Sequence, residues 1–292
     1  MKKRLMAAVL STAMAATMLL TGSISVQAAD AAAANDPAVE LIFTSVSVSG
    51  DSHTEAMYEF ADKVEELSGG SVTCKCYDNG SLFSSENEFD ALLNGDADLA
   101  YISFPTIATQ IPSYSMFASG YLFSSYEHMT SVLNGDIGLN KIRPQIEETL
   151  NIKPLSSFYL GSRVINTREK EINSYDDMNG LLLRMPNSEA WLFLGEALGA
   201  NPTPLSFSEL YTALQTGAVD AQDNPLPSIE SAKFYEVTKY IAITNHVVDS
   251  IMPCINGDTW NSMTEAQQEA VTEAMEYARD VNDTARLDRE AD

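Results

Sequence analysis

The stretch LLLRMPNS, residues 181–188, is the most informative part of the chain, because a strand, a turn and a helix start follow one another directly. Its three leucines predict a short apolar strand that ends at Arg184. Pro186 then turns the chain toward Asn187 or Ser188, and either residue is a good N-cap for a following helix. The stretch therefore predicts a strand-to-helix transition, the unit from which α/β folds are built.

The guanidinium group of Arg184 would lie beside the start of that helix. Free backbone N–H groups and the positive end of the helix dipole favour negative ligands at such a position. The planar fork of an arginine also matches the two oxygens of a carboxylate. The sequence therefore predicts a site for an anion, best a carboxylate, at Arg184.

A second helix start follows at residues 204–217. Ser206 and Glu209 have the spacing of a capping box, and Gly217 is placed to end the helix. The expected buried stripe consists of Leu210, Ala213 and Leu214. Phe207 falls in the first turn, where its ring either faces a cleft and covers a ligand or belongs to the ordinary core.

The preceding half of the chain alternates between strand and helix patterns. Strands are expected at residues 39–45, 71–77 and 97–103, and helices at residues 54–67 and 86–93. This order predicts an α/β fold whose sheet is covered by helices on both faces. No internal repeat is visible after the leader.

The N-terminus has the pattern of a secretory leader. Residues 2–4 are basic, residues 5–20 form an apolar run, and small residues precede a cleavage site after Ala28, so residues 1–28 are predicted to be a cleaved signal peptide. Ser23 stands where a lipobox would need a cysteine, so no lipid anchor is expected. Residues 29–38 are expected to be a flexible mature N-terminus. The protein is thus predicted to be periplasmic, or extracellular if its source lacks an outer membrane.

The chain is strongly acidic, with a formal net charge of −24 at pH 7. Loss of the three basic leader residues would make the mature protein more negative still. Such a surface repels nucleic acids and anionic membranes, so neither is an expected partner.

Catalytic, cofactor and metal motifs are scarce. No nucleophile elbow, phosphate-binding loop or dinucleotide fingerprint occurs, and no catalytic residue or cofactor is predicted. His53, His128 and His246 lie far apart and are interpreted as helix-start or surface residues, so no metal site is expected. The acids Asp176 and Asp177 are better explained as the first turn of a short helix capped by Ser174 than as acid/base catalysts.

The cysteines do not form an obvious disulfide framework. Cys74 and Cys76 alternate along a predicted strand, so they share one face but are poorly placed to bond each other. Burial as small apolar side chains is the favoured reading, with Cys254 a distant candidate partner.

Several ordered motifs together resemble the substrate-binding proteins of TRAP transporters, the DctP type. They comprise residues 161–167, 178–186, 198–204, 208–220 and 222–225. The likeness extends outward to residues 77–82, 126–128, 233–237 and 256–260, and so covers nearly the whole mature chain.

This resemblance implies a two-lobed, periplasmic-binding-protein-like clamshell with a central ligand cleft. The first lobe would comprise residues 39–160, with residues 250–292 returning to it and packing as a C-terminal helix. The second would comprise residues 161–249. The last helix is expected to start at a Thr264–Gln267 capping box and to run to Asp292 without a stop signal. Family members usually carry more C-terminal helix, so a fragment or a truncated gene product is one interpretation of this ending.

The resemblance also implies roles for individual residues. Arg184 matches the arginine that forms the principal salt bridge to a ligand carboxylate, and Arg163 matches a supporting arginine. For Arg163 the alternative is a structural pair with a local acid. The remaining predicted pocket residues are Asn224, the aromatic Phe207, Asn187 one turn from Arg184, and Ser103 on the wall of the first lobe.

The implied function is that of an extracytoplasmic solute receptor, acting as a monomer. It would capture a small organic acid and deliver it to integral membrane subunits of a TRAP transporter. Dicarboxylates, keto acids, sugar acids and aromatic acids are all compatible with one arginine anchor. A secreted sensory module and, less favoured, an enzyme acting on a carboxylate remain as alternatives.

Overall fold

The computed structural model describes residues 36–292. The signal peptide expected at residues 1–28, and most of the N-terminal segment expected at residues 29–38, lie outside the described residues. At the start of the described chain, Thr264 donates a hydrogen bond to Asp36, and Gln267 Nε2 donates one to the Pro37 carbonyl at 2.8 Å. These first residues are therefore held against the beginning of the last helix.

In the described residues the strands form one nine-stranded mixed sheet in the order β2-β1-β3-β9-β5-β8-β6-β7, with β4 paired to β9. The strands are β1 Val39–Thr44, β2 Val72–Tyr77, β3 Leu99–Ile102, β4 Ile152–Pro154, β5 Phe158–Thr167, β6 Leu182–Met185, β7 Asn201–Pro204, β8 Ala221–Pro225 and β9 Tyr240–Asn256. The three strands expected near residues 39–45, 71–77 and 97–103 are confirmed as β1, β2 and β3.

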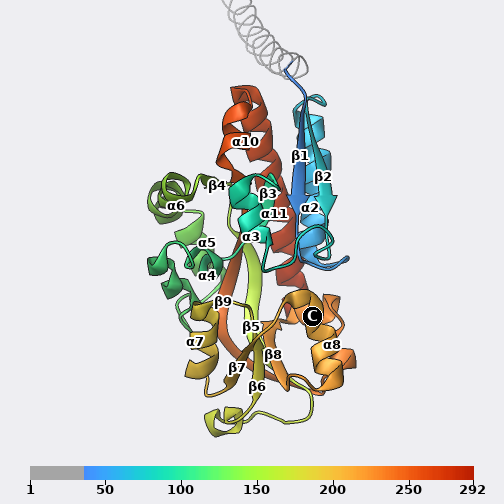
Figure 1. The fold of residues 1–292 in the computed structure, drawn as a ribbon, viewed down its shortest axis with the longest axis vertical. Coiled ribbons are helices and arrows are strands. Elements are labelled where there is room, and N and C mark those ends of the chain that lie inside the picture. Colours follow the sequence, from blue (N-terminus) through green and yellow to red (C-terminus); the bar gives the residue numbers. More distant parts are fainter. Residues whose placement is uncertain (1–35) are drawn as a thin grey trace, which may run out of the picture.

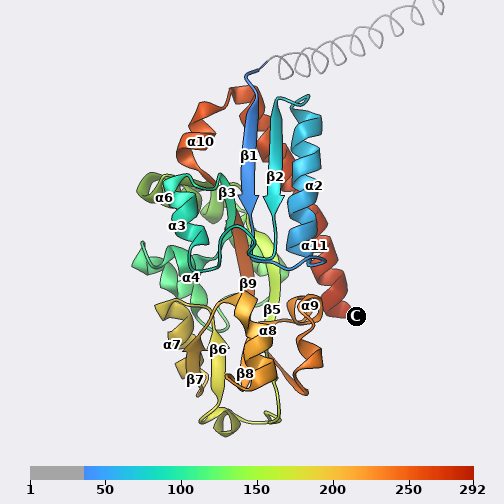
Figure 2. The same cartoon turned by 45° about the vertical axis from the view of Figure 1, so that its right-hand side comes forward.

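The sheet is divided into two lobes that share β5 and β9. Strands β3 and β4 pair with the C-terminal part of β9, and β1 and β2 follow outward from β3, whereas β8, β6 and β7 extend from β5. Figures 1 and 2 show the two groups stacked along the long axis, with β5 and β9 running from one to the other. We call the group around β1–β4 lobe 1 and the group around β6–β8 lobe 2. The residue limits expected for the lobes stay a prediction, because β5 and β9 pass through both without a break.

Helices cover both faces of the sheet in each lobe. They are α2 Ser52–Leu67, α3 Glu88–Asn94, α4 Phe104–Ile107, α5 Tyr126–Leu133, α6 Arg143–Leu150, α7 Glu189–Ala197, α8 Phe207–Thr216, α9 Leu226–Ser231, α10 Gly257–Ser262 and α11 Glu265–Ala291. In β3, Leu99 and Tyr101 join one apolar cluster while Ala100 and Ile102 join another. In β5, Ile165 and Val164 are likewise divided between two clusters. This alternation confirms the predicted α/β fold.

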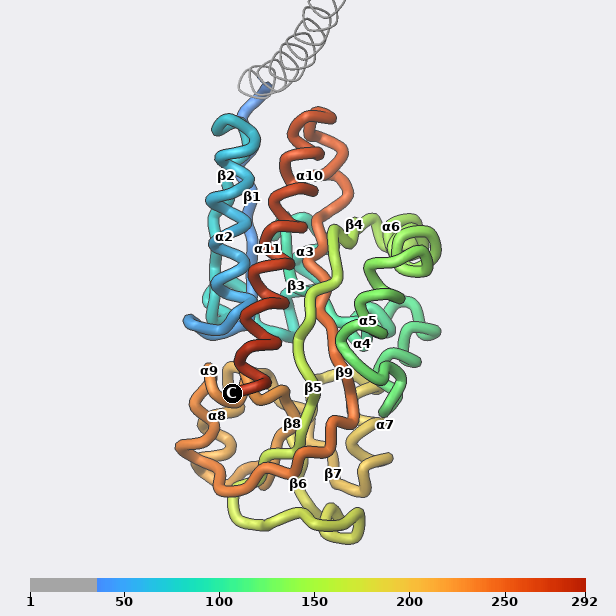
Figure 3. Tube along the Cα trace, turned by 180° about the vertical axis from the view of Figure 1, so that it is seen from behind, coloured from blue at the N-terminus to red at the C-terminus, as the bar shows by residue number. Residues whose placement is uncertain are grey.

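The long helix α11 connects the two lobes. It packs along α2 in lobe 1 and against β5, and its last turns reach α9 in lobe 2, as Figure 3 shows from behind. Asn282 Nδ2 donates to the Tyr159 carbonyl at 2.9 Å, and Arg286 Nη1 donates to Ser228 Oγ at 3.0 Å. The predicted capping box at its start is present. The helix expected to pack on lobe 1 therefore also contacts lobe 2.

The two strand-to-helix motifs fold largely as predicted. Residues 181–188 form β6 and the start of α7, and Ser188 rather than Asn187 is the N-cap, accepting a hydrogen bond from the Trp191 N–H at 3.4 Å. Ser206 precedes α8, but its hydroxyl donates to Glu209 at 2.8 Å, so the expected reciprocal capping box is wrong. Gly217, at φ 80°, ends α8 as predicted.

The structure bears on the expectations for the cysteines and for His246. Cys74, Cys76 and Cys254 are all free thiols, and Cys74 and Cys76 are half-buried against the core of lobe 1. The interpretation of His246 as a helix-start or surface residue is wrong, because it is fully buried on β9. No helix in residues 36–292 is both long and apolar enough to cross a membrane.

Candidate functional site

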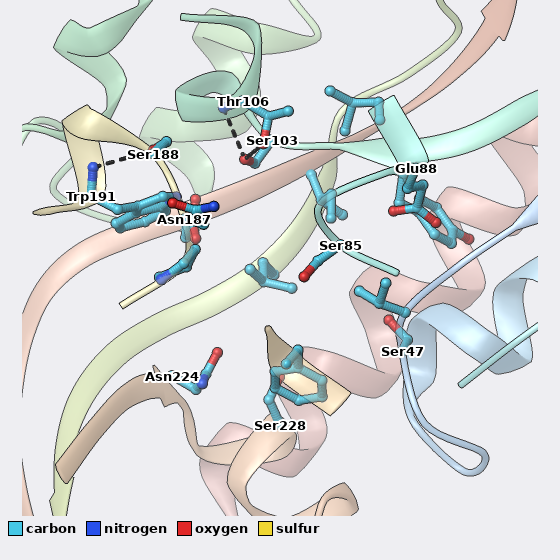
Figure 4. Close-up of a pocket in the computed structure, with 18 of the residues that line it drawn as sticks. Ser47, Ser85, Glu88, Ser103, Thr106, Asn187, Ser188, Trp191, Asn224 and Ser228 are labelled. Carbon is cyan, nitrogen blue, oxygen red and sulfur yellow. Dashed lines mark hydrogen bonds between the residues drawn. The ribbon is translucent and has the colours of Figure 1, made fainter. Parts of the chain in front are cut away.

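A cavity of about 170 Å³ lies between the lobes. From lobe 1 its wall includes Ser47, Glu88, Ser103 and Thr106, and from lobe 2 it includes Asn187, Ser188, Trp191, Asn224 and Ser228 (Figure 4). All six residues predicted from the sequence line this one cavity: Arg184, Arg163, Asn224, Phe207, Asn187 and Ser103. Arg163, Arg184 and Asn224 come together because β5, β8 and β6 are neighbours in the sheet, and Ser103 reaches the same cavity from the end of β3 in lobe 1. 

Arg184 is a buried cation that has no carboxylate partner within residues 36–292. Its side chain lies at the end of β6, is only 2% exposed, and donates from Nε to the Leu205 carbonyl at 2.8 Å. Among residues 36–292, no acidic side chain lies within 4.0 Å of it. Burial lowers the pKa of Arg184 to about 10, against the attraction of the more distant Asp223. The guanidinium therefore remains charged at neutral pH and lacks a counter-ion.

Phe207 combines both of the roles left open by its sequence position. Its ring lies beneath the Arg184 guanidinium, with 5.9 Å between Cζ and the ring centroid. It also packs edge-on against Phe234, with 5.7 Å between the ring centroids. The ring is thus both cavity wall and part of the core of lobe 2.

Arg163, in contrast, is fully paired. Its Nε donates to Asp249 Oδ2 at 2.7 Å, and its Nη1 donates to Asp223 Oδ1 at 3.0 Å. Its guanidinium also lies over the Trp191 ring, 4.3 Å from Cζ to the centroid. Burial pulls the pKa of Arg163 down, but the two carboxylates outweigh it and the net shift is upward. The contacts match the structural alternative for Arg163, although the side chain still borders the cavity.

The two acids that bind Arg163, Asp223 and Asp249, differ in the direction in which their pKa values are shifted. Burial alone would raise the pKa of Asp223, but Arg163 and a hydrogen bond with His246 at 3.1 Å bring it below its ordinary value. For Asp249 the effect of burial is larger than that of Arg163, so its pKa is raised. His246, which the sequence reading placed at the surface, therefore belongs to the ion network beneath the cavity.

Asn224 is oriented by a relay of amides. Tyr240 offers its carbonyl to Asn166 Nδ2 at 3.0 Å, Asn166 Oδ1 accepts from Gln222 Nε2 at 3.1 Å, and Gln222 Oε1 accepts from Asn224 Nδ2 at 2.6 Å. Because the backbone carbonyl can only accept, it fixes the direction of the whole relay. Asn224 Oδ1 consequently points into the cavity, as Figure 4 shows.

Ser103 and Asn187 occupy opposite walls. Ser103 is the N-cap of α4, and its Oγ lies 2.9 Å from Thr106 Oγ1, so a pair of hydroxyls faces the cavity from lobe 1. Asn187 is exposed on the lobe 2 side, immediately before the Ser188 cap of α7. Neither side chain is needed to complete the core.

The cavity residues that were not predicted from the sequence include Asp51, Glu88, Trp191 and Arg286. Arg286 on α11 donates to Asp51 and to His53 Nδ1, so it is also paired. Asp51 and Glu88 lie at helix starts, where acidic side chains are common on protein surfaces. Arg286 lies within a long helix, and nothing in the neighbouring sequence distinguishes it from a surface arginine. The pairing between Arg286 and Asp51 joins residues 235 positions apart, which no local signal reveals.

Comparison with known proteins agrees with this geometry. Residues 43–292 match the family model DctP, the bacterial extracellular solute-binding proteins of family 7. The chain belongs to this family. It is 32% identical to the sialic acid-binding periplasmic protein SiaP of Vibrio cholerae over 232 residues, which is 80% of this chain and 72% of that protein.

Solved structures of the same family have the same two-lobed fold. A TRAP periplasmic solute-binding protein of Roseobacter denitrificans with bound 3-deoxy-D-manno-oct-2-ulosonic acid is 38% identical, with a TM-score of 0.82 over 87% of this chain and 84% of that one. The sugar acid-binding protein DctPAm of Advenella mimigardefordensis, in complex with galactonate, is 28% identical, with a TM-score of 0.84 over 88% of this chain and 82% of that one. The family resemblance and the clamshell fold predicted from the sequence are confirmed.

Proposed function

We propose that this protein is an extracytoplasmic receptor that captures a small organic acid and delivers it to the membrane subunits of a TRAP transporter. The observation that carries the proposal is Arg184, a buried guanidinium in the cavity with no carboxylate partner. A buried charge is costly unless it is paired. A ligand carboxylate would accept hydrogen bonds from both Nη groups of Arg184, which have no carboxylate partner within residues 36–292.

Binding is coupled to closure of the two lobes. The ligand would contact Arg184 and Asn224 from lobe 2 and Ser103 from lobe 1 together only when the cleft is closed. Its affinity for the closed form therefore exceeds its affinity for the open form, and this difference shifts the population toward closure. The closed form is what the transporter subunits would recognise.

A receptor fits the cavity better than an enzyme does. Asp223 and Asp51 are held in ion pairs with Arg163 and Arg286, which keep the pKa values of both carboxyl groups below the ordinary range and make them poor proton acceptors. Asp249 and Glu88 have raised pKa values, so the main support for a receptor comes from the relatives. The relatives described above are binding proteins, and their ligands are sialic acid, an octulosonic acid and galactonate. These names support an organic acid with several hydroxyl groups as the ligand of this protein as well.

Export completes the proposal. The leader at residues 1–28 would direct the chain across the cytoplasmic membrane, and cleavage after Ala28 would release a monomeric receptor. N-terminal sequencing of the protein recovered from the extracytoplasmic fraction checks this step, and an intact Met1 would contradict it.

A thermal-shift screen of the mature protein against a library of organic acids tests the function. A ligand that binds only the folded state raises the melting temperature with concentration. We expect at least one carboxylate to do so in wild type and to have no effect on Arg184→Ala. If no organic acid shifts the wild type, or if the shift survives in Arg184→Ala, the proposed function or its anchor is wrong.

A further inference from the structure

Glu88 is the one acidic side chain of the lobe 1 cavity wall that forms no ion pair within residues 36–292. It is the first residue of α3 and is only 5% exposed. Its Oε1 is fully buried without a hydrogen bond, and no cationic group of the described residues lies within 4.0 Å. Figure 4 shows its carboxyl group on the lobe 1 side of the cavity, across from Asn187 and Asn224.

A carboxyl group in this position favours its neutral form. Burial raises the pKa of Glu88 well above its ordinary value, and the neighbouring Thr44 opposes this only in part. A neutral carboxyl group has one O–H donor as well as acceptor oxygens. It can therefore give a hydrogen bond to a ligand hydroxyl and accept one from it.

The charged residues of the described cavity wall can neutralise one negative charge on a ligand. Arg163 is paired with Asp223 and Asp249, and Arg286 is paired with Asp51. Arg184 alone lacks a counter-ion among the described cavity residues. One carboxylate neutralises it, whereas a second carboxylate on the same ligand would find no free cation in the described cavity wall and would approach Glu88.

We propose that Glu88 binds a hydroxyl group at the end of the ligand remote from Arg184, so that the cavity selects hydroxylated monocarboxylates against dicarboxylates. This inference rests on the proposed function and names its ligand class. The cavity wall supports it, because Ser47, Ser103 and Thr106 add further hydroxyls on the same lobe. Asn224 Oδ1 adds an acceptor from the opposite lobe.

Matched pairs of acids test the selection. D-erythronate and meso-tartrate differ only in whether the terminal carbon is an alcohol or a carboxylate, and so do galactonate and galactarate. Calorimetric titration of the wild type should show binding of an aldonate at least about tenfold tighter than of its matched diacid, the factor that corresponds to about 1.4 kcal/mol. Succinate and butyrate complete the panel as a dicarboxylate and a monocarboxylate without hydroxyls.

Two substitutions test the role of Glu88 itself. Glu88→Gln keeps a neutral group that donates and accepts, so it should bind the aldonate within about threefold of wild type. Glu88→Met keeps the length but removes both functions, and loss of a hydrogen bond of about 1–2 kcal/mol should weaken aldonate binding roughly tenfold. Because Met removes a buried polar group that lacks a partner in the free protein, its melting temperature without ligand should be unchanged or higher.

The outcomes separate this inference from the proposed function. Tight binding of a diacid or butyrate, or an aldonate affinity of Glu88→Met within threefold of wild type, overturns the role of Glu88 and leaves the receptor function intact. Weak binding by Glu88→Gln as well as Glu88→Met overturns the neutral form. If no organic acid of the panel or of the wider library binds the wild type, the proposed function fails first.

Discussion

The surroundings of Arg184 and Arg163 differ in a way that separates binding from structure. Both arginines are buried in lobe 2, and both border the same cavity. Arg163 binds two carboxylates and lies over an indole ring. Arg184 donates to one backbone carbonyl and otherwise borders the cavity. The pKa of Arg163 is raised and that of Arg184 is lowered. We therefore expect Arg163, whose charge the protein itself neutralises, to stabilise the fold, and Arg184, which has no carboxylate partner in residues 36–292, to bind the ligand.

Replacement of Arg184 should have the largest effect on binding. Breaking a buried charge pair costs about 3–5 kcal/mol, so Arg184→Ala should weaken affinity for the cognate acid by roughly two to four orders of magnitude. Arg184→Lys should restore little, because lysine keeps the charge but loses the planar fork. Calorimetric titration with the tightest acid of the screen measures both.

Arg163→Ala is the comparison in the same experiment, provided that the variant is folded by circular dichroism. Its loss of affinity should be smaller, because Arg163 is already occupied by Asp223 and Asp249. If Arg184→Ala binds within about threefold of wild type, well under 1 kcal/mol, the carboxylate is not held by Arg184.

Stability without ligand should reverse the order of the two arginines. Arg163→Met leaves two carboxylates buried side by side without their cation, which should cost about 3–5 kcal/mol of unfolding free energy. Arg184→Met removes a charge that has no partner and should leave stability unchanged or raise it. Urea unfolding of the ligand-free proteins measures the difference. Arg289→Met is the control, since Arg289 is partly exposed, lies 4.0 Å from Glu55 and otherwise donates to the Gly50 carbonyl and Ser231, so its loss should cost less than that of Arg163. Equal destabilisation by both buried substitutions would remove the distinction between them.

The same contrast explains how far the sequence alone could go. Arg184 and its helix cap at Ser188 are close in the chain, so the strand, the turn and the anion site follow from local rules. The partners of Arg163 lie 60 and 86 residues away, and their approach depends on the order of β5, β8 and β9 in the sheet. The motif resemblance placed Arg163 in the pocket, but it could not show that two acids would neutralise it.

Glu88 is a cavity residue that neither local sequence rules nor the motif resemblance predicted. In the sequence it is one of many acids and lies where a helix begins, which is the usual place of a solvated carboxylate. Only the packing of α3 against the cleft makes it buried and unpaired. The interpretation of His246 as a helix-start or surface residue was wrong for the same reason, because its burial beside Asp223 arises only when the strands of the sheet come together. Residues whose partners are local were therefore predicted, and residues whose environment is made by distant strands were not.

The third arginine, Arg286, extends the comparison to pH. It donates to Asp51 and to Nδ1 of a neutral His53, and burial, together with Arg286, lowers the pKa of His53 to about 4 from 6.5. Unfolded His53 therefore takes up a proton below about pH 6.5, whereas folded His53 does so only below about pH 4. The contribution of His53 is complete above pH 6.5 and is lost as the pH falls toward 4. Its full size is about 3 kcal/mol, from about 1.4 kcal/mol for each pKa unit.

His53→Gln isolates this contribution, because glutamine can accept the Arg286 hydrogen bond but cannot be protonated. The difference in unfolding free energy between wild type and variant, measured by urea unfolding, should shift in favour of the variant between pH 6.5 and pH 4.5. A difference that stays constant over this interval would mean that His53 is protonated in the folded protein, and that the Arg286 cluster is not neutralised as its contacts indicate.

The smallest effect should come from Phe207, which supports Arg184 through the face of its ring. Phe207→Leu keeps an apolar side chain against Phe234 but removes the aromatic face that lies 5.9 Å from the Arg184 guanidinium. A cation over an aromatic ring is stabilised by about 0.5–2 kcal/mol, so affinity for the cognate acid should fall by roughly threefold to thirtyfold. The effect should vanish in the Arg184→Ala background, because there is then no cation for the ring to support. A double-mutant cycle by calorimetric titration, at acid concentrations high enough to saturate the weak variants, measures this coupling. Additive losses would show that Phe207 contacts the ligand independently, and would separate the aromatic wall from the arginine that this comparison places above it.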